Sequence, residues 1–250
     1  YDDDGHVTGA KPADTAFSHT IIEMFMVEAN EAVARLLVDQ QVPHLRRVHP
    51  EPDPATAESL QKFLKAVGLP VPASFDREAI QSLLGFVKGR PESFAVNLAI
   101  LRSMQEAVYS PELVGHYALA SRHYAHFTSP IRRYPDLTVH RLLDAYLAGR
   151  FKSKTGRHDV PSYSDLEEIG SQCSTNERRA EDAEREYKLV KILQLLEKHL
   201  GDEYEGVVTG VTNFGVFVQL RELLIDGLLR FDQLPDDWWD VDAQRGCVVG

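Results

Sequence analysis

The sequence predicts an α+β protein in which a largely helical part is followed by a short β-rich part. Two observations lead to this class. Apolar residues recur at helical spacing over most of the first 200 residues, and after residue 200 the pattern changes to the β-branched and aromatic residues of strands. We therefore place a domain boundary at about residue 200, with one domain at residues 1–200 and a second at residues 201–250.

The first expected helix covers residues 16–40, where apolar side chains fall at i, i+3 and i+4 spacing. Pro43 follows its end. A proline-rich connector at residues 48–54 comes next. Three further helical patterns, each bounded by Gly or Pro, then cover residues 55–67, 76–88 and 92–107.

Another helix is expected to begin near Ile131, with Thr128, Ser129 and Pro130 as its cap. It should stop at Gly149, and residues 151–164 should form a surface loop. A long, highly charged helix is expected over residues 165–200, ending at Gly201. Beyond it, glycines interrupt strand-like segments, and the chain closes on a run, GCVVG, that is typical of a strand.

Composition limits the classes of function. No run of about 18 uncharged apolar residues occurs, and the first residues do not resemble a secretion signal, so we expect a soluble cytoplasmic protein without membrane contact. Cys173 and Cys247 are the only cysteines and read as small apolar residues. The formal charge of −11 disfavours a nucleic-acid partner but leaves room for a local basic channel.

Residues 115–143 concentrate histidines, tyrosines and the pair Arg132-Arg133. Two permanently charged guanidinium groups beside the free N–H groups of a helix start would suit a phosphodiester. The alternative is structural, with the pair on a solvated face or bound to Asp136. His140 is interpreted as a structural residue at a packing face. His116, His123 and His126 match no zinc-ligand spacing.

The run HFTSPIRRYPDL at residues 126–137 resembles the signature of the ribonuclease II and ribonuclease R (RNB) family. YSPELVGHYALA, just before it, is similar to that family's preceding segment. Two more stretches, IIEMFMVEANEAVA at residues 21–34 and NERRAEDAERE at residues 176–186, resemble a helix near the family's metal site and its long late helix. The matches follow the family's order and span nearly the whole chain.

The resemblance implies that the first domain is the C-terminal half of an RNB catalytic domain. It also implies processive 3′-to-5′ hydrolysis of single-stranded RNA to nucleoside 5′-monophosphates. By the same resemblance Arg132 would contact the scissile phosphate and Arg133 an adjacent one. Glu23, or alternatively Glu28, would recognise the sugar 2′-hydroxyl, and Glu184 would lie near the terminal nucleotides.

Ser129 and Tyr134, in the same run, are further candidate RNA contacts. The implied cofactor is Mg²⁺, but the family's aspartate ligands precede the helix with which this chain opens. Consecutive aspartates at Asp2, Asp3 and Asp4 are better explained by a β-turn, because neighbouring side chains on a strand point to opposite faces. We therefore predict no metal ligands here, a natural protein that begins upstream, and no activity for this chain alone.

The second domain resembles an RNA-binding OB fold, and it is short enough that we expect an incomplete β-barrel. Phe214 would stack on bases, Gly215 would permit a bend between strands, and Arg230 would contact RNA. Phe217 is predicted as barrel core, because residues three apart lie on opposite faces of a regular strand.

Single-stranded RNA is the expected partner, with the RNA-degradation machinery as a further class, and the natural guess for the oligomeric state is a monomer. Two alternatives to the exoribonuclease remain. One is a catalytically dead RNB-family RNA-binding regulator, and the other is a helical interaction scaffold joined to an OB module.

Overall fold

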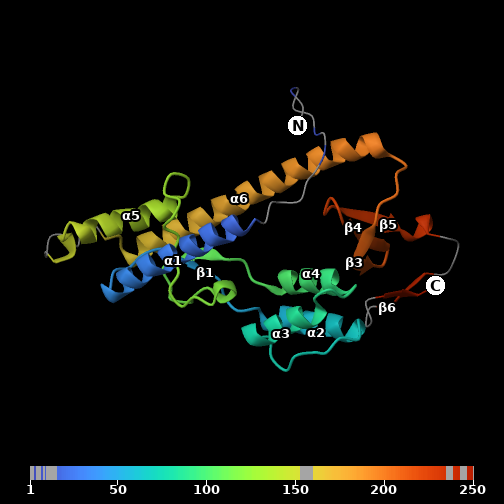
Figure 1. Ribbon diagram of the computed structural model, residues 1–250, viewed down its shortest axis with the longest axis horizontal. Helices are drawn as coiled ribbons and strands as arrows, with labels where there is room; N and C mark the ends of the chain where they lie inside the picture. The colour runs from blue at the N-terminus through green and yellow to red at the C-terminus, as the bar shows by residue number, and fades with distance from the viewer. Residues whose placement is uncertain are drawn as a thin grey trace. The chain divides into compact units, whose positions relative to one another are not determined.

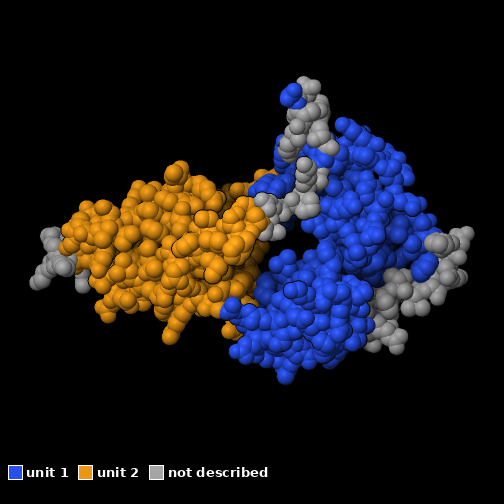
Figure 2. All heavy atoms as spheres, viewed as in Figure 1, with its two compact units in different colours: residues 1–11, 52–104, 184–250 blue, residues 12–51, 105–183 orange. Residues whose placement is uncertain are grey.

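The computed structural model describes residues 3, 7, 9, 16–152, 160–234, 239–242 and 247–249. The chain divides into two compact units, each built from separate stretches of sequence (Figure 2). Unit 1 contains residues 1–11, 52–104 and 184–250, and unit 2 contains residues 12–51 and 105–183. Helices and small antiparallel sheets occur together, so the predicted α+β class is confirmed.

Unit 2 is built around the helices α1 (Phe17–Asp39) and α5 (Tyr134–Leu147). The buried face of α1 carries Asn30, Ala34 and Leu37, which fall at i, i+4 and i+7 and so share one side of the helix. Its core cluster consists of Ala34, Leu37, Val42, Ala125, Val139 and Leu142.

Two short strands in unit 2, β1 (Arg46–Val48) and β2 (Val108–Ser110), pair antiparallel. The long helix α6 (Tyr163–Leu196) packs on β2 through Gly170, where an added Cβ would lie 2.6 Å from the Tyr109 carbonyl oxygen. One turn later the Ser174 hydroxyl accepts from Tyr109 N at 2.9 Å. Glycine at 170 therefore allows the helix to approach the strand closely.

Short 3₁₀ turns at η1 (Tyr117–Leu119) and η2 (Arg150–Lys152) complete the described part of unit 2. Of the loop expected at residues 151–164, residues 153–159 lie outside the described residues, as do Asp2 and Asp4 of the expected turn. The last two residues of the expected loop belong instead to α6, which begins at Tyr163. Cys173, on α6, is partly buried.

Unit 1 contains three packed helices, α2 (Pro54–Ala66), α3 (Arg77–Val87) and α4 (Ser93–Ser103), which lie together in Figure 1. Asp53 and Asp76 cap α2 and α3, because their carboxylates accept from Ala55 N at 2.8 Å and Ala79 N at 2.9 Å. The pattern at residues 92–107 predicted a longer helix than α4. In the structure α4 ends at Ser103, and an extended segment leads from there to β2.

The β-rich part of unit 1 starts after a 3₁₀ turn, η4 (Glu197–His199), and so agrees with the change of pattern near residue 200. It contains an antiparallel meander of three strands, β3 (Gly206–Thr212), β4 (Gly215–Leu220) and β5 (Asp226–Arg230). The register between β3 and β4 shifts between Val208 and Gly210. After η5 (Phe231–Gln233), β6 (Asp240–Asp242) and β7 (Cys247–Val249) pair separately.

Candidate functional site

The segment that carries the arginine pair is a turn, and not the first turn of a helix. Arg132 N and Arg133 N both donate to the Ser129 carbonyl oxygen, at 3.3 and 3.1 Å. α5 begins only at Tyr134, so the start predicted near Ile131 is wrong. The physical reason is Pro135: in a helix begun at Ile131 its ring would clash with the preceding turn, whereas in the first turn of α5 its missing N–H costs nothing.

Asp136 ties this turn to α5. Its side chain is fully buried, and Oδ1 accepts from Ser129 N at 2.8 Å and from Arg133 Nη2 at 2.7 Å. The N–H of Ser129 is therefore already bonded, which corrects the expectation that it is free for a phosphate. Arg133 follows the structural alternative, because its guanidinium neutralises a buried carboxylate.

Arg132 has a different environment. Its side chain is exposed beside the fully exposed Ile131, and within the described residues it takes part in no ion pair. Tyr134, at the start of α5, is also about half exposed. A turn fixed by Asp136 therefore presents one uncommitted guanidinium to solvent.

A buried aromatic and imidazole network supports the segment before this turn. The Tyr109 hydroxyl lies 2.9 Å from Nδ1 of His126, and the Arg47 guanidinium lies 4.6 Å from the centre of the Tyr109 ring. Arg47 also forms an ion pair with Glu177 of α6. Burial raises the pKa of Tyr109 to about 12, so this phenol keeps its proton and can donate a hydrogen bond to His126.

Burial, with the positive charge of Arg133 nearby, lowers the pKa of His126 to about 3. The imidazole is therefore neutral at physiological pH, and its Nδ1 can accept from the Tyr109 hydroxyl. His140 performs a related task on α5, where Nε2 bonds the Phe127 carbonyl oxygen at 2.8 Å and the two rings stack at 4.1 Å. This geometry agrees with the structural interpretation of His140.

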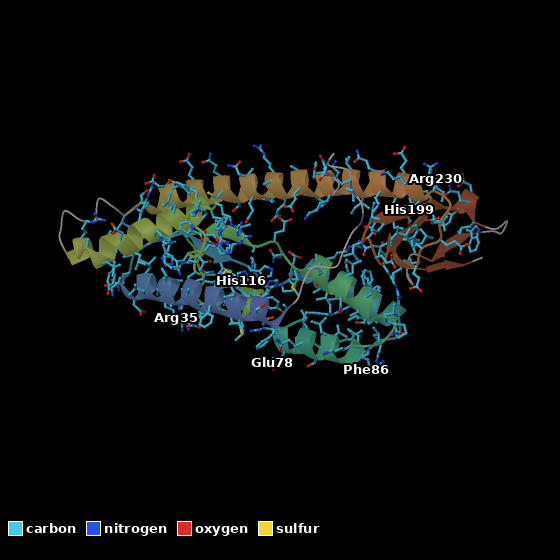
Figure 3. All side chains as sticks on the ribbon, turned by 45° about the horizontal axis from the view of Figure 1, so that its top comes forward. Arg35, Glu78, Phe86, His116, His199 and Arg230 are labelled. Atoms are coloured by element: carbon cyan, nitrogen blue, oxygen red, sulfur yellow. The ribbon has the colours of Figure 1, made fainter. Side chains whose placement is uncertain are left out.

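His116, which is labelled in Figure 3, belongs to the same interior. Its ring lies 5.0 Å from that of His49 and 5.2 Å from that of Tyr124. Burial lowers the pKa of His116 to about 4, which keeps it neutral. No group of three or more His, Cys, Asp or Glu side chains in the described part of the chain could hold a metal ion. The described residues thus do not form a Mg²⁺ site, and we derive no chemical step through the ion.

The candidate carboxylates lie on two helices. Glu23 is exposed on α1, and so is Glu28, which forms an ion pair with Arg35 at 2.9 Å. Glu184, on the part of α6 that belongs to unit 1, bonds Lys188 at 2.5 Å, and this contact lowers the pKa of its carboxyl group. Glu23 is the less committed of the two α1 candidates, because Glu28 is already paired.

The β-rich part presents a separate group of candidates. Phe214 is exposed in the turn between β3 and β4, and its ring lies 6.4 Å from that of Phe217, edge to face. The expectation that the two rings lie on opposite faces is wrong, because Phe214 belongs to the turn and not to a regular strand. Phe214 and Arg230 line one surface pocket.

Gly215 is needed for a close approach and not for a bend. A Cβ at this position would lie 2.5 Å from the Leu229 carbonyl oxygen of the neighbouring strand β5. The glycine therefore lets β5 reach the start of β4, where Arg230 is its register partner.

Residues 1–149 match the RNB domain, and residues 197–248 match the S1 RNA binding domain. The chain therefore belongs to the RNB family, and the resemblance inferred from the run at residues 126–137 is confirmed. The arrangement of an RNB part followed by an S1 domain agrees with the predicted fold.

Among individual proteins, the chain is 40% identical to Ribonuclease R of Aquifex aeolicus over its whole length, which is 35% of that relative. It thus spans about a third of the relative's length. Among solved structures it is similar to RNase R of Mycoplasma genitalium in complex with ribose methylated single-stranded RNA. That likeness has a TM-score of 0.85 and 30% identity, and covers 95% of this chain and 37% of the other.

The structure of yeast Ssd1, described as a pseudonuclease, is also similar, with a TM-score of 0.72 and 22% identity, covering 94% of this chain and 29% of the other. At that identity only the fold is shared.

Proposed function

We propose that the protein containing this chain is a metal-dependent exoribonuclease that removes nucleoside 5′-monophosphates processively from the 3′ end of single-stranded RNA. The main support is Arg132, which lies on a turn fixed by Asp136 within the run that resembles the family signature. Its guanidinium is exposed and forms no ion pair with any residue that the structure describes. The names of the relatives, Ribonuclease R, also support it.

In this proposal each part of the site has one task. Arg132 contacts the scissile phosphate and offsets the charge that develops on its oxygens as the bond breaks. Arg133 holds the turn and adds positive potential behind it. Glu23 accepts from the sugar 2′-hydroxyl, which distinguishes RNA from DNA. The proposal includes Mg²⁺ as the cofactor that the family resemblance implies, with its ligands expected upstream of this chain.

The other candidate contacts serve to hold the strand. Tyr134 offers a half-exposed ring next to Arg132, and the Ser129 carbonyl organises the turn. Glu184 would lie near the terminal nucleotides. Phe214 would stack on an unpaired base and Arg230, in the same surface pocket, would contact the backbone of the RNA.

No helix in the described part of the chain is both long and apolar enough to span a membrane. The cytoplasmic location, the monomeric state and association with RNA-degradation machinery stay predictions.

The test uses the full natural protein and single-stranded RNA labelled at the 5′ end. With Mg²⁺ we expect a ladder that shortens from the 3′ end, and mononucleotide release when the 3′ end carries the label. Arg132→Ala should lower the rate by about 100-fold, because it removes a donor to developing charge. Arg35→Ala, which loses the ion pairs with Glu28 and Glu31 and a hydrogen bond to the Glu31 carbonyl within α1, is the matched control.

The remaining outcomes separate the alternatives. RNA that is bound but never shortened indicates the catalytically dead regulator. RNA binding and turnover that are both unaffected by Arg132→Ala would indicate that this part of the chain is a scaffold.

A further inference from the structure

The side chain of Asn30 connects α1 to the segment that leads into the arginine turn. Asn30 is 3% exposed and lies in the apolar stripe of α1 with Ala34 and Leu37. Its Oδ1 accepts from Phe127 N at 2.9 Å, and its Nδ2 donates to the Tyr124 hydroxyl at 2.9 Å. A backbone N–H can only donate, so the contact with Phe127 fixes which way the amide points.

Two side chains of α5 hold the backbone at Phe127 and at Ser129. His140 holds the Phe127 carbonyl and Asp136 holds Ser129 N, while the Ser129 carbonyl accepts from the N–H groups of Arg132 and Arg133. Because α5 continues directly from this turn, these bonds set the local shape of the turn. Asn30 instead bonds it to a different helix.

The helix that carries Asn30 also carries Glu23. The two residues are separated by about two helical turns, so they lie on the same side of α1. The bond from Asn30 to Phe127 thus sets where the arginine turn lies along α1, and with it the place of Arg132 relative to Glu23.

We propose that Asn30 is a positioning residue that fixes the place of Arg132 relative to Glu23, and this inference rests on the proposed function. Leucine at position 30 would keep the volume but remove both bonds, leaving Phe127 N without its buried acceptor. A displacement of about 1 Å in a group that contacts the reacting phosphate can lower the rate by roughly 100-fold.

The first test is a kinetic cycle in the full natural protein. Asn30→Leu should lower kcat by roughly 10- to 100-fold with KM little changed, because most RNA contacts lie elsewhere. Asn30→Asp should recover most of the rate, since a carboxylate can accept from both Phe127 N and the Tyr124 hydroxyl. In an Arg132→Ala background, Asn30→Leu should lower the rate by no more than twofold further. Independent, multiplying effects of the two substitutions would overturn the proposal.

The second test does not require turnover. Hydrogen exchange of the backbone around residues 124–133 should accelerate in Asn30→Leu and stay unchanged in Asn97→Leu, an exposed asparagine on α4. Exchange that accelerates equally throughout unit 2 would mean a general loss of stability and would overturn the positioning role. If the wild-type protein does not shorten RNA, the proposed function fails. The hydrogen-exchange comparison, which needs no turnover, then decides the role of Asn30.

Discussion

Arg132 and Arg133 are neighbours in the chain but have different surroundings. Arg133 faces a buried carboxylate, and Arg132 faces solvent from the turn at residues 130–132. The sequence predicts that both arginines contact phosphates, Arg132 the scissile one and Arg133 an adjacent one, with a structural role beside Asp136 as the alternative. In the structure, the buried Asp136 binds one of the two guanidinium groups and leaves the other available.

This difference predicts unequal effects on stability. Arg133→Ala should lower the free energy of unfolding by about 3 kcal/mol, because it leaves the Asp136 carboxylate buried without its counter-charge. Arg132→Ala should change it by no more than about 0.5 kcal/mol, as expected for an exposed side chain. Urea denaturation of the two variants measures both, and equal stabilities would contradict the assigned roles.

His126 should make the stability of the fold depend on pH. Its pKa falls from the ordinary value of 6.5 to about 3 in the folded chain. As pH drops below about 6.5, the unfolded chain therefore binds a proton that the folded chain does not, and stability is lost progressively until the pH approaches 3.

Replacing His126 with Gln should flatten the decline of unfolding free energy between pH 7 and pH 5, as measured by urea denaturation at a series of pH values. His44 and His116, whose pKa values burial lowers to about 4, will maintain part of the slope. Between pH 7.5 and 9 the variant and the wild type should have parallel profiles. An unchanged acid slope would mean that His126 is not buried as a neutral imidazole.

At the scale of elements, one face of α6 packs on the small sheet of unit 2. α6 places Gly170, Ser174 and Glu177 on the side that meets β1 and β2. The charge pattern of the sequence predicts a long solvated helix, and most of α6 is exposed. The short buried stretch near its N-terminal end is where it supports Tyr109 and Arg47.

Gly170→Ala should therefore destabilise the protein by about 1–3 kcal/mol, although alanine is the better helix former, because the new methyl group meets the Tyr109 carbonyl. The control is Gly85→Ala in α3, where nothing lies within 4 Å of an added Cβ. That change should stabilise by about 0.5–1 kcal/mol. Thermal or urea unfolding gives the comparison, and the same sign for both variants would refute the close approach.

At the scale of the whole chain, the net charge of −11 limits how RNA could bind to it under the proposed function. An acidic chain must make its phosphate contacts at a few local cations, so each contact should be visible in the dependence of affinity on salt. Arg132 is the uncommitted guanidinium of the turn, whereas Arg35 on the outer side of α1 is occupied by Glu28 and Glu31 (Figure 3).

Arg132→Ala should accordingly reduce the slope of log affinity against log salt by about 0.7, the value for one phosphate contact to a single strand. Arg35→Ala should leave the slope unchanged. Fluorescence anisotropy with a short single-stranded RNA at several salt concentrations measures both. If the slope of log affinity against log salt in Arg132→Ala equals that of the wild type, Arg132 does not contact a phosphate.

The sequence alone determined the α+β class, the presence of the main helices, the change of pattern near residue 200 and the run that indicates the family. These features are local, because periodicity and capping depend on neighbours in the chain. The later start of α5 was also readable from the sequence, since Pro135 fits only its first turn.

Only the tertiary structure separated Arg132 from Arg133, because the burial of Asp136 depends on how α5 packs. The same holds for the three-residue strands β1 and β2, which are too short to have a period of their own. Asn30 had one weak signal, a polar residue inside an apolar helical stripe. Its partners, Tyr124 and Phe127, lie far away in sequence. Only packing brings those groups together, and a buried amide is stable there because both of its bonds are made.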